Sequence, residues 1–191
     1  MNKLRFGTKE VVAVIAATII YVLVEAFERY LIGQGLLAEP VLDWVRIRVL
    51  IVIVVAAMFG PIVGVVCGVG GALLVNVIFY GYISYSEVVT YALSGYLVGR
   101  YYDKLGVLNG EFKGIALVDF NAIQILTHIV CSVLFLPLFL FATENEVLGA
   151  TIVLGVKNAV GAIIETCVLG TPILYIVSKS LKKSHRTIKK V

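Results

Sequence analysis

The chain has 191 residues, of which 60% are hydrophobic and 15% are charged, and its mean hydropathy is +1.01. Soluble globular domains contain about 45–50% apolar and about 25% charged residues, so this composition excludes an ordinary soluble domain. The abundant apolar surface also excludes a disordered chain. The net charge of +4 comes from basic residues at the ends of apolar segments, which argues against nucleic-acid binding. We therefore predict a multi-pass integral membrane protein.

The first half of the chain predicts three membrane helices. The first covers residues 10–32 and is followed by a loop over residues 33–43 that contains two glycines and a proline. No charged residue occurs between Val49 and Ser86, a run too long for one span and suited to two. Because Gly60-Pro61 interrupts that run, we expect helices over residues 44–60 and 61–80.

The second half predicts three more helices, separated by polar or charged loops. They cover residues 87–102, 115–141 and 147–179, and a basic tail follows over residues 180–191. The predicted fold is an all-α, compact bundle of six transmembrane helices that forms a single membrane domain over residues 1–191.

The distribution of Lys and Arg predicts that both termini are cytoplasmic. With six spans, the two termini and the even-numbered loops share one side of the membrane. That side carries twelve basic residues: Lys3, Arg5, Lys9, Arg100, Lys104, Lys113, Lys179, Lys182, Lys183, Arg186, Lys189 and Lys190. The other side carries three: Arg29, Arg46 and Arg48. Cytoplasmic loops are enriched in Lys and Arg, so the richer side is assigned to the cytoplasm.

Motifs for enzymatic chemistry are missing from the sequence. Cys67, Cys131 and Cys167 lie in apolar runs without C-x-x-C spacing, so we interpret them as small core residues. Two histidines cannot supply a histidine-rich metal site, and no phosphate-binding loop, zinc-protease or hydrolase motif occurs. We predict no enzymatic activity, no metal and no cofactor.

Small residues recur at four-residue spacing, which allows close approach of helices in lipid. In the predicted third and fourth helices, we interpret the Gly60–Ala72 set and the pair Gly95 and Gly99 as packing within the bundle. The first helix carries Ala13 and Ala17, with Ala16 beside them. This alanine set fits either internal packing or the docking of a partner protein.

Polar side chains cluster in the predicted outer half of the membrane and suggest one binding pocket open to the outside. Polar groups at membrane depth are costly, so each is a candidate functional residue. The predicted substrate-binding residues are Asn76, Tyr80, Tyr85, Glu87, Tyr91, Gln124, His128, Lys157, Asn158 and Arg46. Aromatic, amide and carboxylate groups together suit a small heteroaromatic ligand with hydrogen-bonding substituents.

Several of these residues also have structural interpretations. Tyr80 and Tyr85 could belong to an interfacial aromatic belt, and Glu87 could simply favour a helix N-terminus. Arg46 and Arg48 could pair with Asp43 or with lipid phosphate. Lys157 lies about 15 Å into its helix, at 1.5 Å per residue, and needs a carboxylate partner or an anionic ligand group.

Three segments carry a resemblance to a known family: "TKEVVAVIAA" (8–17), "AAMFGPIVGVVCGVGGALLVNVIFYG" (56–81) and "SGYLVGRYYDK" (94–104). They resemble the substrate-binding S components of energy-coupling factor (ECF) vitamin transporters, of the riboflavin-type group. The resemblance covers residues 8–104 in motifs and the remaining half in the layout of its spans.

The resemblance implies an outward-facing vitamin site and three partner chains. A transmembrane coupling subunit would dock on Ala13, Ala16 and Ala17, and two cytoplasmic ATPases would supply energy, in a bacterial plasma membrane. Loops 33–43 and 81–86 would act as lids over the site. The polar set favours a hydroxymethyl-pyrimidine precursor of thiamine, with riboflavin and cobalamin as alternatives.

Two other functions fit the same sequence. An autonomous proton-coupled carrier could use Glu87, Glu165, His128 and Lys157 as a proton relay. A membrane protein with a purely structural role would need none of these side chains for activity.

Overall fold

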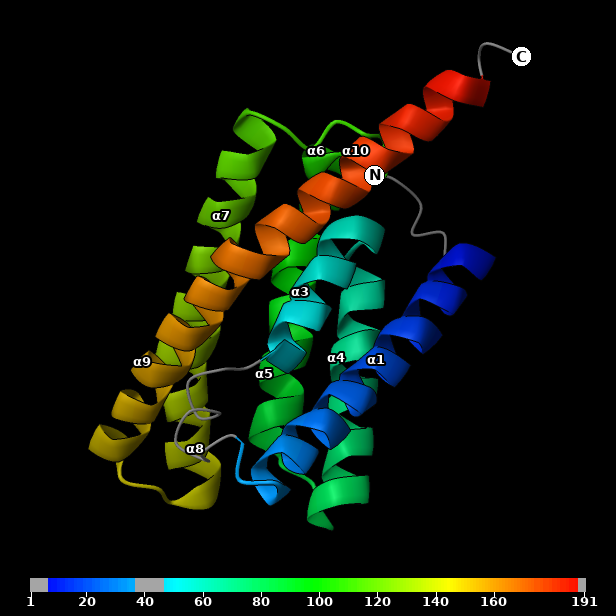
Figure 1. Cartoon of the computed structure of the whole chain (residues 1–191). Coiled ribbons are helices and arrows are strands. Elements are labelled where there is room, and N and C mark those ends of the chain that lie inside the picture. Colours follow the sequence, from blue (N-terminus) through cyan, green and yellow to red (C-terminus); the bar gives the residue numbers. More distant parts are fainter. Residues whose placement is uncertain (1–6, 37–46, 189–191) are drawn as a thin grey trace.

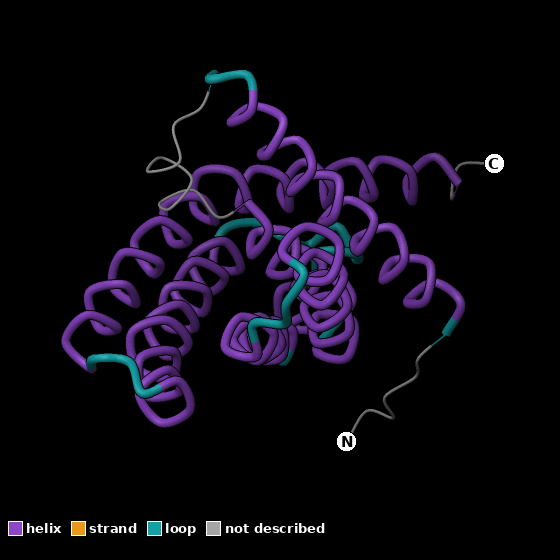
Figure 2. The backbone as a smooth tube through the Cα atoms, turned by 90° about the horizontal axis from the view of Figure 1, so that it is seen from below, coloured by secondary structure: helices purple, strands orange, loops and turns teal. Residues whose placement is uncertain are grey.

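A computed structural model of the chain describes residues 7–36 and 47–188, with side chains described as far as Lys183. Seen from below, these residues form helices joined by short loops, with no strand in the described part (Figure 2). The helical bodies, shown in Figure 1, are α1 (Thr8–Gly33); α3 (Ile47–Phe59); α4 (Pro61–Val75) with the π-helical η1 (Asn76–Tyr80); α5 (Tyr85–Gly99); α6 (Tyr102–Leu105); α7 (Ile115–His128) with η2 (Ile129–Phe135) and α8 (Leu136–Glu144); and α9 (Leu148–Glu165) with η3 (Thr166–Gly170) and α10 (Thr171–Ile188).

The all-α class is confirmed, but the described residues form seven helical bodies where six were expected. The additional body is α6, a single turn that ends at Gly106, whose φ of 59° lies in the left-handed region. Within the described ranges, four helices are long and apolar enough to span a membrane: Thr8–Gly33, Pro61–Tyr80, Ile115–Glu144 and Leu148–Lys183. The cytoplasmic location of the termini stays a prediction.

The last helix runs farther than the sequence pattern indicated. The expected basic tail began at residue 180, whereas α10 continues to Ile188. The loop before α7 packs on this part of α10. The Phe112 amide donates to Ser178 Oγ at 3.1 Å, and a Cβ on Gly110 would lie 2.7 Å from the Cβ of Lys182. The start of the expected second helix and most of the loop over residues 33–43 lie outside the described residues.

Helices α4 and α5 form the most closely packed pair of the bundle, through their glycines. A Cβ on Gly64 would lie 2.7 Å from the Gly95 carbonyl oxygen, and one on Gly99 would lie 2.6 Å from Pro61. Such distances leave no room for any side chain, so the backbones themselves are in contact. The prediction that these glycines serve packing within the bundle is confirmed.

Helix α1 packs on α3 and α4 with one narrow face. Tyr21 is fully buried there, and its ring covers Gly71 of α4, where a Cβ would lie 2.7 Å away. The opposite face of α1 is apolar and exposed over its whole length, at Val12, Ile15, Ile19, Leu23 and Phe27. In a membrane protein such a face contacts lipid or another protein.

Candidate functional site

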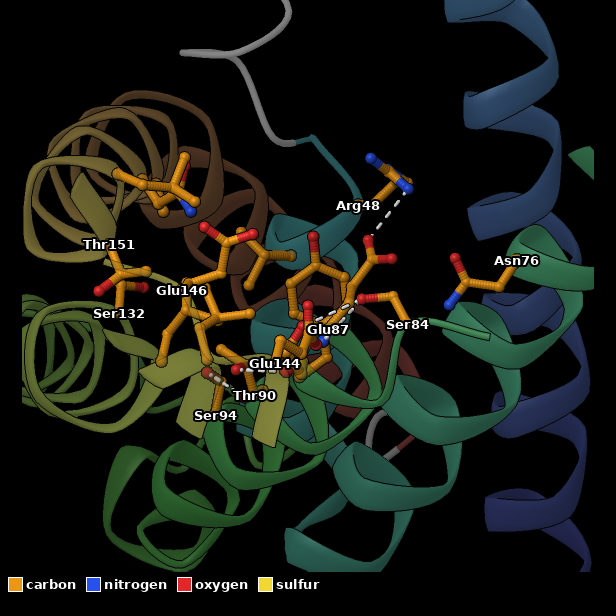
Figure 3. A pocket seen from close by; sticks show the side chains of 18 of the residues that line it. Arg48, Asn76, Ser84, Glu87, Thr90, Ser94, Ser132, Glu144, Glu146 and Thr151 are labelled. Carbon is orange, nitrogen blue, oxygen red and sulfur yellow. Dashed lines mark hydrogen bonds and ion pairs between the residues drawn. The ribbon is translucent and has the colours of Figure 1, made fainter. Parts of the chain in front are cut away.

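A cavity of about 480 Å³ lies at one end of the bundle, the lower end in Figure 1. At this end α3, α5 and α9 begin, and η1 and α8 end, so five helical bodies supply its walls. The volume falls within the range of about 300–1,000 Å³ that is typical of ligand pockets. Figure 3 shows its lining, whose polar members are Arg48, Asn76, Tyr80, Tyr82, Ser84, Ser86, Glu87, Thr90, Tyr91, Ser94, His128, Ser132, Glu144, Glu146, Thr151 and Asn158.

Helix α5 contributes a stripe of hydroxyl groups to the cavity. Ser86, Thr90 and Ser94 recur every four residues and therefore lie along one face of the helix. The Thr90 hydroxyl donates to the Ser86 carbonyl at 2.6 Å, and the Ser94 hydroxyl donates to the Thr90 carbonyl at 2.8 Å. Because their protons are committed to the backbone, these two hydroxyl oxygens face the cavity as acceptors.

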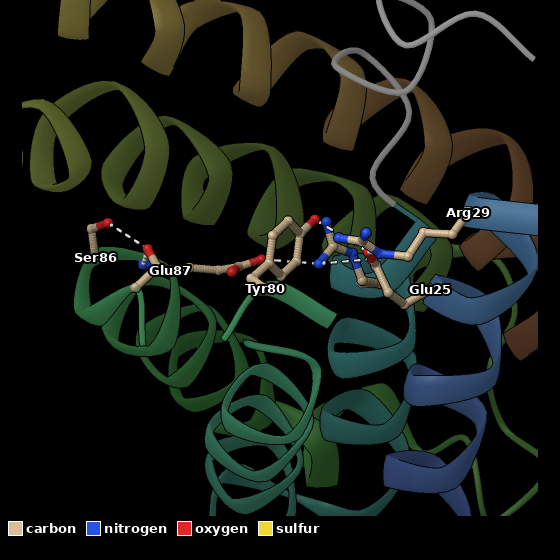
Figure 4. Close-up of polar contacts among 7 residues, drawn as sticks. Glu25, Arg29, Tyr80, Ser86 and Glu87 are labelled. Carbon is tan, nitrogen blue, oxygen red and sulfur yellow. Dashed lines mark hydrogen bonds and ion pairs between the residues drawn. The ribbon is translucent and has the colours of Figure 1, made fainter. Parts of the chain in front are cut away.

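Beside the cavity, a buried ionic cluster joins α1, α3, η1 and α5 (Figure 4). Arg48 Nη1 lies 3.1 Å from Glu25 Oε2 and 3.2 Å from Glu87 Oε1. Glu25 also accepts from Arg29 Nε at 2.7 Å and from the Tyr80 hydroxyl at 3.1 Å. Two guanidinium groups thus face two carboxylates, and each buried charge has an opposite partner within hydrogen-bond distance.

His128 reaches the cavity from the junction of α7 and η2. Its ring is almost fully buried, and Nε2 lies 3.4 Å from the Thr166 hydroxyl. Gln124, one turn earlier, points elsewhere and donates to Cys167 Sγ at 2.9 Å. Four-residue spacing places the two side chains on the same side of the helix, but the Gln124 amide is engaged by Cys167 of η3 and does not line the cavity. No group of three His, Cys, Asp or Glu side chains among the described residues could hold a metal ion.

Two buried amides in the cavity wall have polar atoms without hydrogen-bond partners in the described part of the chain. Asn76 on η1 is 1% exposed and its Nδ2 is unpaired, while Asn158 on α9 is 4% exposed and its Oδ1 is unpaired. The Asn76 amide nitrogen projects from η1 toward the cavity (Figure 3). An unsatisfied buried polar atom costs about 1–3 kcal/mol, so both atoms suit a bound ligand.

Six of the ten predicted substrate-binding residues line the cavity: Asn76, Tyr80, Glu87, Tyr91, His128 and Asn158. Tyr85 does not; it is 66% exposed on the outer side of α5. Lys157 does not line it either, because consecutive helical residues point about 100° apart and Asn158 takes the inward position. Gln124 faces η3, and Arg46 lies outside the described residues.

Several lining residues were absent from the predicted set. Arg48, which lines the cavity, follows the predicted Arg46 by two positions in the sequence. The four-residue spacing of Ser86, Thr90 and Ser94 is a signal that could have identified the hydroxyl face of α5. Ser132 follows the predicted His128 by four positions, which is the same signal, whereas Thr151 is an isolated hydroxyl in an apolar stretch.

The alanines of α1, predicted to contact a partner, do not share one surface. Ala16 is exposed, Ala13 is half-buried, and Ala17 is only 3% exposed on the face toward the bundle. Ala17 is therefore inaccessible to another protein. A docking surface on α1 would instead contain Ala16 with the exposed Val12, Ile15 and Ile19 around it.

Comparisons with known proteins agree on one family. The family model described as "ECF-type riboflavin transporter, S component" matches residues 13–182. The UPF0397 protein of Staphylococcus aureus strain Newman is 32% identical over 134 residues, which cover 69% of this chain and 73% of that protein. The UPF0397 protein of strain bovine RF122 is 30% identical over 136 residues, or 71% and 74% of the two chains. No solved structure shows a significant match.

Proposed function

Because the chain belongs to the family of ECF-type riboflavin transporter S components, we propose that its cavity captures a water-soluble vitamin or vitamin precursor for import. As a family member it is a membrane protein and a substrate-binding subunit of an ECF transporter. The family suggests a binding role and not an enzymatic one.

One observation carries the proposal: a partly polar cavity of about 480 Å³ holds two buried amides whose polar atoms lack partners among the described residues. Tyr80, Tyr82 and Tyr91 add aromatic surface to the same cavity. Ring faces and amide groups together recognise flat, hydrogen-bonding heteroaromatic molecules. Of the substrates considered, a hydroxymethyl-pyrimidine or riboflavin suits this volume better than the much larger cobalamin.

The charge distribution supports an outward-facing orientation of the cavity. The basic residues Lys104, Lys113 and Lys179 lie at the end of the bundle away from the cavity, and basic loops favour the cytoplasm. The cavity would then open outward, where it meets the vitamin. In this proposal, release to the inside requires a transmembrane coupling subunit and two ATPase subunits in a bacterial plasma membrane, since this chain has no phosphate-binding loop.

The alternative of an autonomous proton-coupled carrier finds less support. A relay would bring Glu87, Glu165, His128 and Lys157 together, but only Glu87 and His128 line the cavity. Glu87 is moreover paired with Arg48, whose Nη1 lies 3.2 Å from Glu87 Oε1.

The proposal is tested by titrating the purified full chain in detergent with a panel of water-soluble vitamins and precursors, using calorimetry. We expect one compound class to bind with 1:1 stoichiometry, and Asn158→Leu to weaken that binding about tenfold, the equivalent of about 1.4 kcal/mol for one hydrogen bond.

Asn109→Ala is the matched control, because Asn109 is exposed in the loop at the opposite end of the bundle. It should bind as the unchanged chain does. The proposal fails if no compound binds, or if Asn158→Leu binds as tightly as the control.

A further inference from the structure

Several hydroxyl groups that line the cavity act as hydrogen-bond acceptors. The hydroxyls of Thr90, Ser94 and Thr151 donate to backbone carbonyls, at 2.6, 2.8 and 2.9 Å respectively. While these bonds are kept, their oxygens act as acceptors toward a ligand. Asn158 Oδ1 is a further acceptor without a partner in the described part of the chain, and Glu87 adds a carboxylate. Among the lining groups whose role these bonds fix, acceptors therefore predominate.

The charged residues that line the cavity also disfavour an anionic ligand. Among the described residues, Arg48 is the one cation that lines the cavity, and both Glu25 and Glu87 already balance it. Glu144 and Glu146 add two more carboxylates, both on exposed residues. Three lining carboxylates therefore face one guanidinium, whose charge is already matched.

Binding of an anionic ligand in this cavity would be energetically unfavourable. A phosphate or carboxylate presents acceptors only, so it matches neither the hydroxyl oxygens nor Asn158 Oδ1. It would also give up hydration without meeting an unmatched cation, and nearby carboxylates would repel it. Arg48 Nε and Asn76 Nδ2 are buried donors without partners among the described residues, and an acceptor on a neutral ring can satisfy either.

On the basis of the proposed function, we propose that the substrate is a neutral or cationic, donor-rich heteroaromatic compound, and that the site rejects anionic vitamins and phosphate esters. A ring nitrogen would accept from Asn76 Nδ2, while an exocyclic amino group would donate to Asn158 Oδ1 or to the α5 hydroxyls. The site would thereby select the dephosphorylated form of its substrate.

The test uses matched pairs that differ by one phosphate: thiamine and thiamine monophosphate, riboflavin and its 5′-phosphate, and hydroxymethyl-pyrimidine and its phosphate. Biotin, pantothenate and nicotinate serve as anionic vitamins. Calorimetry on the purified full chain should find the tightest binder among the neutral or cationic compounds. Its phosphate ester should bind at least about tenfold more weakly, which corresponds to about 1.4 kcal/mol.

Two outcomes overturn the inference in distinguishable ways. If an anionic vitamin binds most tightly, or if an ester binds as well as its parent, the substrate class is wrong while the vitamin-binding function stands. If no compound of the panel binds, the proposed function fails and the inference fails with it.

A charge variant tests the cause. Glu87→Gln removes one lining carboxylate and one of the two partners of Arg48, so the affinity ratio of ester to parent should rise about tenfold, or by about 1.4 kcal/mol. Glu111→Gln, at the opposite end of the bundle, should leave the ratio unchanged. If Glu87→Gln does not fold, the exposed pair Glu144→Gln and Glu146→Gln should move the ratio in the same direction. An unchanged ratio in the folded variants would contradict the inference.

Discussion

Arg48 joins the ionic cluster to the cavity wall. Its guanidinium is shared by Glu25 of α1 and Glu87 of α5, so one side chain ties three helices together beside the cavity. Removing one member of a buried charge cluster leaves the remaining charges without compensation, and this costs more than the intact pair contributes.

We therefore expect Arg48→Met to lower the free energy of unfolding by about 3 kcal/mol, because Glu87 loses its partner and Glu25 loses one of three. Thermal unfolding in detergent measures the effect. The control is Lys104→Met, which breaks the Lys104–Asp119 pair, whose lysine is 63% exposed. That surface pair should contribute less than about 1 kcal/mol. Equal effects of the two variants would contradict the assignment.

For single residues, the sequence predicted how deep in the membrane each polar side chain lies, but not the direction in which it points. Asn76, Glu87 and Asn158 lie in the outer half of predicted helices, and that placed them near the cavity correctly. The sequence does not show which face of each helix is turned toward the cavity, because these helices carry apolar residues on every face. For this reason both Lys157 and Asn158 were predicted to bind the substrate, whereas only Asn158 lines the cavity.

At the scale of the elements, the contact between α4 and α5 fixes two walls of the cavity. Gly68 brings α4 against the Tyr91 carbonyl, where a Cβ would lie 2.8 Å away, and Tyr91 itself lines the cavity. The glycine spacing in the sequence predicted close packing within the bundle, and the structure shows that the two glycine sets meet each other.

Gly64→Ala should destabilise the bundle by about 1–3 kcal/mol, since its Cβ would lie 2.7 Å from the Gly95 carbonyl and the two backbones must separate. Ligand affinity should fall with it, because α5 carries the hydroxyl face of the cavity. Gly149→Ala on α9 is the matched control, since a Cβ there meets nothing within 4 Å. A tolerated Gly64→Ala would show that the α4–α5 contact is looser than described.

The ends of the elements were harder to predict than their existence. The last helix was expected to end near residue 179, because basic residues begin there. Tertiary contacts of Ser178 and Lys182 with the loop before α7 accompany its continuation to Ile188. Hydropathy detects where a helix leaves the apolar layer and does not detect where the helix ends.

For the whole molecule, the cavity and the exposed face of α1 are separate surfaces, and we propose a separate task for each. Ala16 lies among exposed apolar side chains on α1 and does not line the cavity. We expect Ala16→Trp to leave vitamin binding unchanged and to reduce uptake at least about tenfold in cells that contain the coupling subunit and ATPases, because close helix packing requires small residues. Val153→Trp, on the exposed face of α9, should affect neither. Lost binding, or unchanged uptake, in Ala16→Trp would contradict a docking role for α1.

The central claim is that the cavity holds a vitamin or vitamin precursor, and mass spectrometry of small molecules released from the detergent-purified chain tests it most directly. We predict one retained compound in stoichiometric amount, heteroaromatic and without a phosphate, and its absence from Asn76→Leu preparations. A protein that retains nothing and binds no member of the vitamin panel would contradict the claim.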